Sequence, residues 1–341
     1  MKYFAGLDVS MEETAVCVVD ELGAIVREGV AGSEPAALAG WFAGTGLAME
    51  RIGLEAGPLS EWLFEGLRAV GLAAICIETR RMKGASELMA VKTDRGDARL
   101  IAQAMRVGWY RAVHVKSEAS RAMRLLLGNR RRLVEQRVAL DNGMRGALKP
   151  FGIKVGVVSE GRFAERVRTL LSGRAELLAL IEPLLAVRAT LRAQIKVLHR
   201  HVLALVRASA LCRRLMTVPG VGAVVALSFV SGIDDPKRFR RARSVGAHFG
   251  LTPRKYASGE VDRTGGISKA GDEAVRAALF QAAHTMLTRS RRWSALKAWG
   301  TAVAKRRGLR RATAALARKL AGVLLRMWID GTAFRWGATP A

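Results

Sequence analysis

Cysteine is scarce in this sequence, and long apolar runs are missing. The three cysteines, Cys17, Cys76 and Cys212, form no CxxC or Cys/His cluster, so the sequence predicts neither a zinc site nor a disulfide framework. No apolar run reaches the roughly 18 residues that a membrane-spanning helix needs. The N-terminal MKYFAGLDVSMEE carries an acidic residue where a signal peptide keeps its apolar stretch. These absences indicate a cytoplasmic protein without a membrane partner.

Acidic residues are also few. The chain has 29 Asp and Glu against 56 Lys and Arg, which gives a net charge of +27 and an isoelectric point near 11.3. Such a charge predicts a polyanionic partner, nucleic acid before membrane. Residues 1–97 depart from this excess, with 15 acidic and 9 basic residues and a net charge of −6. This split is expected if the front of the chain binds cations and the rest grips phosphates.

At 341 residues the chain exceeds the roughly 250 to 300 at which one hydrophobic core stops growing, so we expect several domains. Residues 1–115 begin with three strand-like stretches and continue with alternating helices and strands, the order of a ribonuclease-H-like α/β domain. Residues 116–207 are helical and charged, which predicts a helical coiled-coil arm or, equally, a plain bundle packed on the front domain. Either could mediate assembly into a homodimer or homotetramer. Pro183 predicts a kink or the start of a new helix.

Residues 208–341 predict a mainly helical domain. Two of its helices are joined by Pro-Gly-Val-Gly, a helix-hairpin-helix-like element whose turn at Gly220 and Gly222 would present backbone N–H groups to a DNA phosphate. A purely structural turn is the open alternative. Residues 252–268 contain several glycines and little periodicity, which predicts a loop, where functional residues concentrate.

Four acidic residues of the front domain share a placement. Asp8 and Glu55 each end a predicted strand, and Asp94 and Asp97 lie one helical turn apart in KTDRGDARLIAQ. Taken singly, Asp8 could be a turn residue at the strand end and Glu55 a surface residue. Asp94 could be a helix cap, and Asp97 could pair with a neighbouring arginine. Together they favour a site for Mg²⁺ or Mn²⁺, because four clustered carboxylates repel one another unless a divalent cation neutralises them. Two such ions about 4 Å apart can activate a nucleophile and stabilise the leaving oxygen of a phosphodiester.

Several basic residues and the glycine turn are predicted to contact nucleic acid. One group precedes or flanks the acidic helix, and a second surrounds the glycine-rich segment near residue 258. The full set is Arg80, Arg81, Lys83, Lys92, Gly220, Gly222, Arg254, Lys255 and Lys269.

These residues resemble a known family. GLDVS, LEAGPLSEWLFEGL and KTDRGDARLIA in the front half, and RFRRARSVGAHFGLTP with GGISKAGDEAVRAAL in the back half, are similar to the DEDD-type insertion-sequence transposases, also called bridge-RNA-guided or seekRNA-guided recombinases. The similarity extends over nearly the whole chain in the expected order. It implies a RuvC-like front domain, a transposase domain at the back and a location in the bacterial cytosol or nucleoid.

The resemblance also implies roles for particular residues. Asp8, Glu55, Asp94 and Asp97 would form the DEDD tetrad, and Ser258 in YASGE would be the catalytic serine that attacks a DNA phosphodiester. A structured guide RNA would pair with the DNA of the element ends and the target. Taken alone, Ser258 is most simply a turn residue. Arg254, Lys255 and a helix predicted to begin near Ala270 favour phosphate binding there.

Three questions stay open from the sequence. Ser268 in GGISK is a competing serine, or the cap of the following helix. A metal-dependent nuclease or Holliday-junction resolvase would use the tetrad alone, with water as the nucleophile. A non-catalytic nucleic-acid-binding protein would need neither the tetrad nor the serine.

Overall fold

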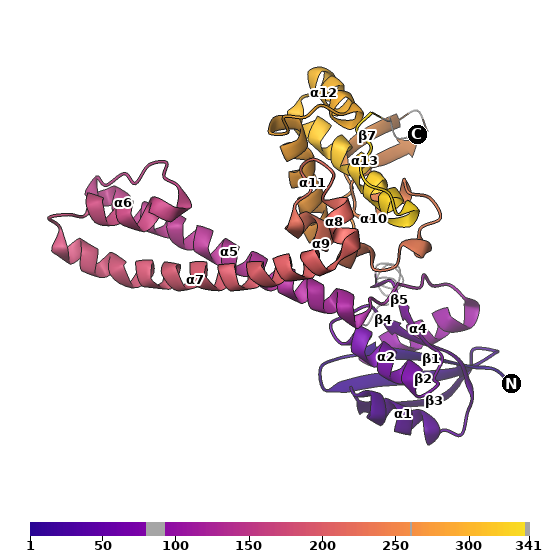
Figure 1. The fold of residues 1–341 in the computed structure, drawn as a ribbon. Helices are drawn as coiled ribbons and strands as arrows, with labels where there is room; N and C mark the ends of the chain where they lie inside the picture. The colour runs from indigo at the N-terminus through magenta and orange to yellow at the C-terminus, as the bar shows by residue number, and fades with distance from the viewer. Residues whose placement is uncertain (80–92, 260, 338–341) are drawn as a thin grey trace. The chain divides into compact units, whose positions relative to one another are not determined.

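The computed structural model describes residues 1–79, 93–259 and 261–337. It divides into two compact units, Met1–Lys116 and Ser117–Ala341 (Figure 1). No helix of the described residues is long and apolar enough to cross a membrane. The finer division into 1–115, 116–207 and 208–341 stays a prediction, as does a cytoplasmic location.

The first unit is built on one mixed sheet. Its strands are β1 (Tyr3–Val9), β2 (Glu13–Asp20), β3 (Ile25–Gly32), β4 (Met49–Glu55) and β5 (Ala74–Ile77). Their order in the sheet is β3-β2-β1-β4-β5. The β1–β2 and β2–β3 pairs are antiparallel, whereas β4 runs parallel to both β1 and β5. The predicted meander of three strands followed by alternating helices and strands is confirmed.

Helices cover both faces of this sheet. α1 (Pro35–Ala43) and α2 (Ser60–Ala69) share a core with Leu7, Val16 and Val18, while α4 (Asp94–Val107) shares the opposite core with Phe4 and Cys17. Successive strand residues point to opposite faces, so β1 and β2 need apolar side chains at nearly every position. Both strands have them, in YFAGLDV and ETAVCVVD.

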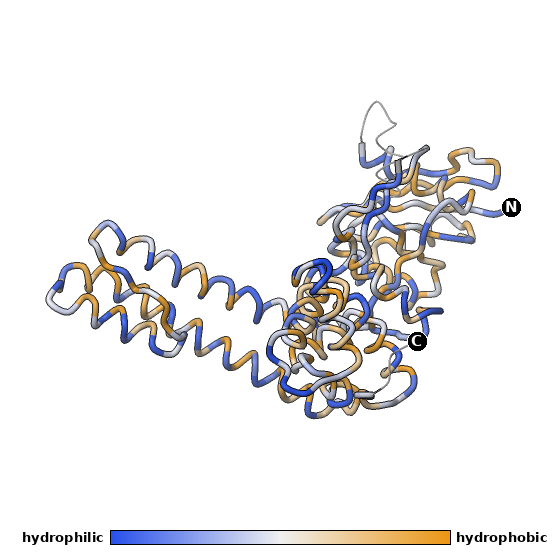
Figure 2. Tube along the Cα trace, turned by 90° about the horizontal axis from the view of Figure 1, so that it is seen from above, coloured by the Kyte–Doolittle hydropathy of each residue, from blue (hydrophilic) through white to orange (hydrophobic). Residues whose placement is uncertain are grey.

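The second unit starts with two long helices. α5 (Glu118–Leu148) and α7 (Ala175–Ala208) lie side by side, with α6 (Phe163–Leu170) near their turn (Figure 1). Figure 2 shows hydrophilic and hydrophobic segments alternating along them, as in amphipathic helices. α7 continues through Pro183, so a new helix does not begin there. Near the turn, buried Arg188 donates from Nε to Asp141 Oδ1 at 2.6 Å and from Nη2 to the Glu160 carbonyl at 2.8 Å, which compensates its burial.

The rest of the second unit is mainly helical around one core. It contains α8 (Ala210–Leu215), α9 (Ala223–Ile233), α10 (Ser244–His248), α11 (Glu273–Thr288), α12 (Ala295–Arg307) and α13 (Leu309–Asp330). Short 3₁₀ helices occur at Lys149–Phe151, Glu160–Arg162 and Pro236–Arg238. Buried faces of α9, α11 and α13 supply most of the core.

The predicted loop at 252–268 is wrong. The chain forms a two-stranded hairpin there, β6 (Pro253–Ser258) and β7 (Val261–Ile267), paired in antiparallel fashion. Gly259, at φ +54°, lies in the tight turn, and Val261 and Ile267 suit a strand. The usual apolar alternation is missing because every residue of β6 is exposed, so no buried face had to be encoded.

Candidate functional site

Parallel pairing of β1 and β4 brings two of the predicted carboxylates to one end of the sheet. Leu7 pairs with Leu54, so Asp8 and Glu55 follow at neighbouring positions on adjacent strands. Both side chains are half-buried, and both take part in interactions. The register therefore supports the prediction that these two acids lie close together.

Helix α4 runs across the sheet with its N-terminus toward the same end. At the far end of the helix, Gln103 Nε2 donates to the Gly23 carbonyl at 2.8 Å, in the turn between β2 and β3. Nearer its start, α4 crosses β1 at Gly6, where an added Cβ would lie 2.1 Å from the Ala98 carbonyl oxygen. Glycine at position 6 thus permits a backbone approach that no other residue allows. Ala98 directly follows Asp97, so the start of α4 lies near Asp8.

Capping explains why Asp94 begins this helix. Thr93, in an extended conformation, accepts a hydrogen bond from the Gly96 amide at 3.1 Å and is the N-cap. Asp94 is therefore not the cap. Asp94 and Asp97 both lie in the first turn, where the helix dipole favours negative charge.

Arg99 has a partner away from the acidic pair. Its guanidinium binds Glu28 of β3 through two hydrogen bonds, Nε–Oε1 at 2.6 Å and Nη2–Oε2 at 2.7 Å. The hydrogen bond from Arg99 lowers the pKa of Glu28. Behind this pair, burial and the Glu28 charge raise the pKa of Cys17 to about 12. The bidentate pair fixes α4 to the sheet beside the carboxylates.

The donor chemistry of the four acids fits a hard divalent cation, since carboxylate oxygens are the ligands that Mg²⁺ and Mn²⁺ prefer. The backbone gathers Asp8, Glu55 and the start of α4 at one end of the sheet. As their side chains are placed, however, no three His, Cys, Asp or Glu residues of the described chain form a group that could hold a metal. The fit rests on donor type and backbone placement, and the side chains would have to turn inward to complete it. Arg80, Arg81, Lys83 and Lys92 lie outside the described residues.

Ser258 ends β6 beside the hairpin turn, where it pairs with Val261. Tyr256 pairs with Arg263, so Ser258, Tyr256 and Arg263 lie on one face of the hairpin. Lys255 lies on the other face and binds Asp262 at 3.1 Å from Nζ to Oδ2. A loop prediction gives no register, so the sequence does not indicate that Arg263 shares a face with Ser258. The Ser-Gly pair between two short extended stretches is the available signal for a hairpin.

The segment after the hairpin differs in detail from the predictions. α11 begins at Glu273, and its cap is Asp272, whose Oδ1 accepts from the Val275 amide at 3.1 Å. Ser268 is therefore not the cap of this helix. Lys269 is exposed at φ +57°, an unusual backbone region for a non-glycine residue, and its amide donates to the Gly250 carbonyl at 3.1 Å.

The two glycines of Pro-Gly-Val-Gly have different surroundings. Gly220, at φ +84°, packs against α11 so closely that a Cβ would lie 2.3 Å from the Ala282 carbonyl oxygen. Gly222 is exposed, begins α9 as its N-cap, and has open space where a Cβ would stand. Packing and the positive φ account for glycine at 220, whereas the surroundings of Gly222 do not require a glycine.

Known proteins resemble both halves of the chain. Residues 212–298 match the family model described as "Transposase IS116/IS110/IS902 family", and residues 5–152 match a DEDD transposase model described as "Transposase". The transposase for insertion sequence element IS1111A of Coxiella burnetii is 28% identical over 341 residues, with 98% of this chain and 91% of the relative covered.

Two shorter matches are more similar in sequence. A probable family 20 transposase of Pseudomonas aeruginosa is 31% identical over 266 residues, with 72% of this chain and 75% of the relative covered. The transposase for insertion sequence element IS1328 of Yersinia enterocolitica is 30% identical over 246 residues, with 71% and 73% covered. The chain is thus a DNA transposase, an enzyme of DNA transposition. It belongs to the IS110/IS116 family of DEDD insertion-sequence transposases.

Proposed function

We propose that the first unit is a ribonuclease-H-like, RuvC-like domain whose Asp8, Glu55, Asp94 and Asp97 serve strand cleavage with a divalent metal ion. The observation that carries this proposal is the arrival of β1, β4 and the N-terminus of α4 at one end of the sheet. The strand order β3-β2-β1-β4-β5, with the first three strands antiparallel, supports the fold assignment. A bound Mg²⁺ or Mn²⁺ would supply positive charge for the phosphodiester and its leaving oxygen.

Ser258 is the proposed nucleophile. Its Oγ forms a bond to the phosphorus, the bond from phosphorus to one deoxyribose oxygen breaks, and that oxygen takes up a proton as a free hydroxyl. The proton of the serine hydroxyl passes to a general base, for which we propose a carboxylate from a neighbouring protomer. The exposed place of Ser258 beside the hairpin turn supports access to a DNA backbone. Arg263 on the same face offers a charge-assisted contact to the phosphate.

The test is the covalent link that this reaction creates. Wild-type protein and Mg²⁺ are incubated with labelled DNA carrying the element ends, and the products are separated under denaturing conditions. We expect a protein–DNA adduct that disappears in Ser258→Ala and persists in the control Ser268→Ala. Cleavage without any adduct, undiminished in Ser258→Ala, would support the nuclease alternative and exclude the serine mechanism.

A structured guide RNA remains part of the proposal, as the source of target choice. The net charge of +27 supports a large polyanionic partner but does not distinguish RNA from DNA. Sequencing of RNA that co-purifies with the protein should find one defined transcript with internal loops complementary to DNA. RNA of no fixed sequence would argue against a guide and for non-specific binding.

A further inference from the structure

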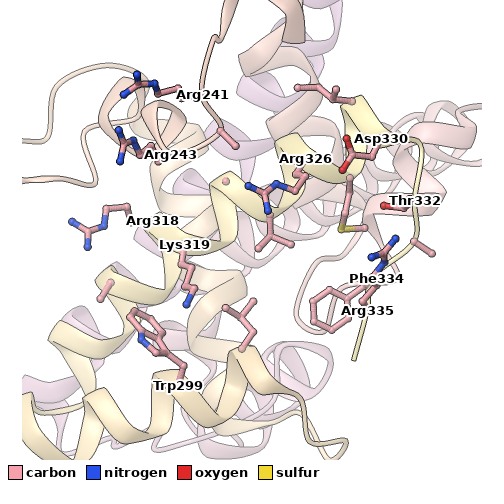
Figure 3. Close-up of a pocket in the computed structure, with 18 of the residues that line it drawn as sticks. Arg241, Arg243, Trp299, Arg318, Lys319, Arg326, Asp330, Thr332, Phe334 and Arg335 are labelled. Atoms are coloured by element: carbon pink, nitrogen blue, oxygen red, sulfur yellow. The ribbon is translucent and has the colours of Figure 1, made fainter. Parts of the chain in front are cut away.

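The second unit contains an open cavity of about 1090 Å³ whose lining does not include Ser258. It lies between the C-terminal helix α13, the Trp299 region of α12, the segment around residues 240–243 and the chain after α13 (Figure 3). The residues that line the cavity include two aromatic ones, Trp299 and Phe334. We call this cavity the α13 groove.

One face of α13 forms its floor. Ala315, Arg318, Gly322 and Arg326 recur at helical spacing along that face, with Lys319 beside them. The small residues leave space between the long cationic ones. At Gly322, an added Cβ would stand 3.3 Å from the Ala242 carbonyl oxygen, so the glycine lets the neighbouring arginine-rich segment approach the helix.

The groove is strongly positive. Its basic side chains are Arg240, Arg241, Arg243, Arg318, Lys319, Arg326 and Arg335, against one acid, Asp330. None of the ion pairs that the structure shows among the described residues involves these seven side chains. In Figure 3, Arg241 and Arg243 come from the segment before α10, and Arg318 and Arg326 come from α13 beside it. Such a set of cations calls for an anion with several charges.

The aromatic rings of the groove indicate an anion that also carries bases able to stack. Lys319 Nζ stands over the half-buried indole ring of Trp299, 4.6 Å from its centroid, so a base can stack on that face once Lys319 turns to a phosphate. Cationic grooves with interleaved aromatic rings are the means by which proteins hold unpaired nucleic acid strands, since every base has a face that stacks. A duplex could reach only the rim, because its bases are stacked inside and a cavity of this size suits a few unstacked groups.

We propose that the α13 groove binds a single-stranded segment of DNA, with its phosphates on Arg318, Lys319 and Arg326 and at least one base on Trp299. DNA is the expected strand because the chain is a DNA transposase, and strand cleavage and exchange expose unpaired DNA. The inference builds on that activity but does not require Ser258 to be the nucleophile.

The experiment measures binding of the full chain to a fluorescent single-stranded DNA of about 12 nucleotides over a series of salt concentrations. The groove variant is Arg318→Gln with Arg326→Gln. Its matched control is Arg310→Gln with Arg311→Gln, which removes the same charge from exposed positions of the same helix outside the groove. Loss of two phosphate contacts should reduce the slope of log affinity against log salt by about 1.4, while the control changes it much less.

Trp299→Leu should weaken single-strand binding about fivefold or more with little change in salt slope, and Trp299→Phe should restore most of the affinity because the ring returns. Thermal melting shows whether each variant folds. If Trp299→Leu does not fold, the proposal is tested with the double variant Arg318→Gln, Arg326→Gln and with Trp299→Phe.

Equal losses in groove and control variants would overturn the proposal, as would equal losses for duplex DNA or an effect confined to RNA of the same sequence. Adduct formation by the wild-type protein on duplex ends tests the proposed cleavage reaction separately.

Discussion

The two compact units differ in charge and in how they use it. Residues 1–116 carry 13 Lys and Arg against 15 Asp and Glu, whereas residues 117–341 carry 43 against 14. In the first unit the backbone directs acids to one end of a sheet. In the second, cations from several elements face an open groove. The difference agrees with the proposal that the first unit holds the catalytic metal ion and the second unit holds phosphates and the nucleophile Ser258.

Removal of divalent ions should have the largest effect, and it should affect the proposed roles of the two units differently. We expect chelation to reduce strand cleavage by about a thousandfold, since loss of metal charge costs several kcal/mol at the transition state. DNA binding by the basic unit should persist in the same buffer. Cleavage rates and binding curves measured side by side give the result, and equal activity after chelation would contradict a metal-dependent first unit.

Metal binding itself should depend on the acids at the sheet end. Asp8→Asn should weaken Mn²⁺ binding by about tenfold or more, because a ligand charge is lost. Binding is measured from the electron paramagnetic resonance signal of free Mn²⁺. Glu12→Gln removes the same charge from an exposed position of the unit and serves as the control. If the two variants bind Mn²⁺ alike, the sheet end is not the metal site.

The close approach of α4 to β1 can be tested with a single added methyl group. Gly6→Ala places a methyl group against the Ala98 carbonyl and should lower the free energy of unfolding of the first unit by about 3 kcal/mol. Gly40→Ala, inside α1 with open space around it, should raise that free energy by about 0.5 to 1 kcal/mol. Chemical denaturation of each variant decides, and a stable Gly6→Ala protein would show that α4 does not lie against β1 as described.

In the second unit, Gly220→Ala should cost about 2 kcal/mol of folding stability, since a methyl group meets the α11 backbone and the residue keeps a positive φ. Gly222→Ala should change stability by less than about 1 kcal/mol, because its surroundings are open. Thermal melting of the pair tests whether the Pro-Gly-Val-Gly turn is held by packing. Similar melting temperatures would favour a purely binding role for both glycines.

Low pH should have a smaller effect on the stability of the first unit, through the ion pair of Glu28 with Arg99. The pKa of Glu28 is lowered from its ordinary 4.5 by Arg99, so its contribution to stability is full above that value and is lost as the pH falls through the lower folded pKa. Arg99→Gln should flatten this dependence below about pH 4.5. Arg131→Gln, which loses an ion pair with Glu135 in the second unit, should leave the first unit's pH profile unchanged. A steep profile in Arg99→Gln would assign the effect to other carboxylates.

The sequence predicted the first unit well because each of its elements has a strong local signal. Apolar strands and acids at strand ends are readable without tertiary information. The approach of α4 at Gly6 was not, since it depends on a contact between residues that are about 90 positions apart.

The second unit was harder to predict. Its exposed hairpin has no buried face, so the β6 and β7 residues lack the alternation that identifies strands. The α13 groove joins residues from 240 to 335, and arginines scattered along a sequence do not indicate that they face one cavity. Lys269 at φ +57° is likewise a property of the folded backbone alone.

The division between the two units is tested most directly with Asp97→Asn under single-turnover conditions, by measuring the cleavage rate at saturating DNA and the DNA affinity in the same titration. We expect a rate about a thousandfold lower, because a proposed metal ligand is lost, with DNA affinity within about twofold of wild type. An unchanged rate, or a rate loss fully explained by weaker DNA binding, would contradict it.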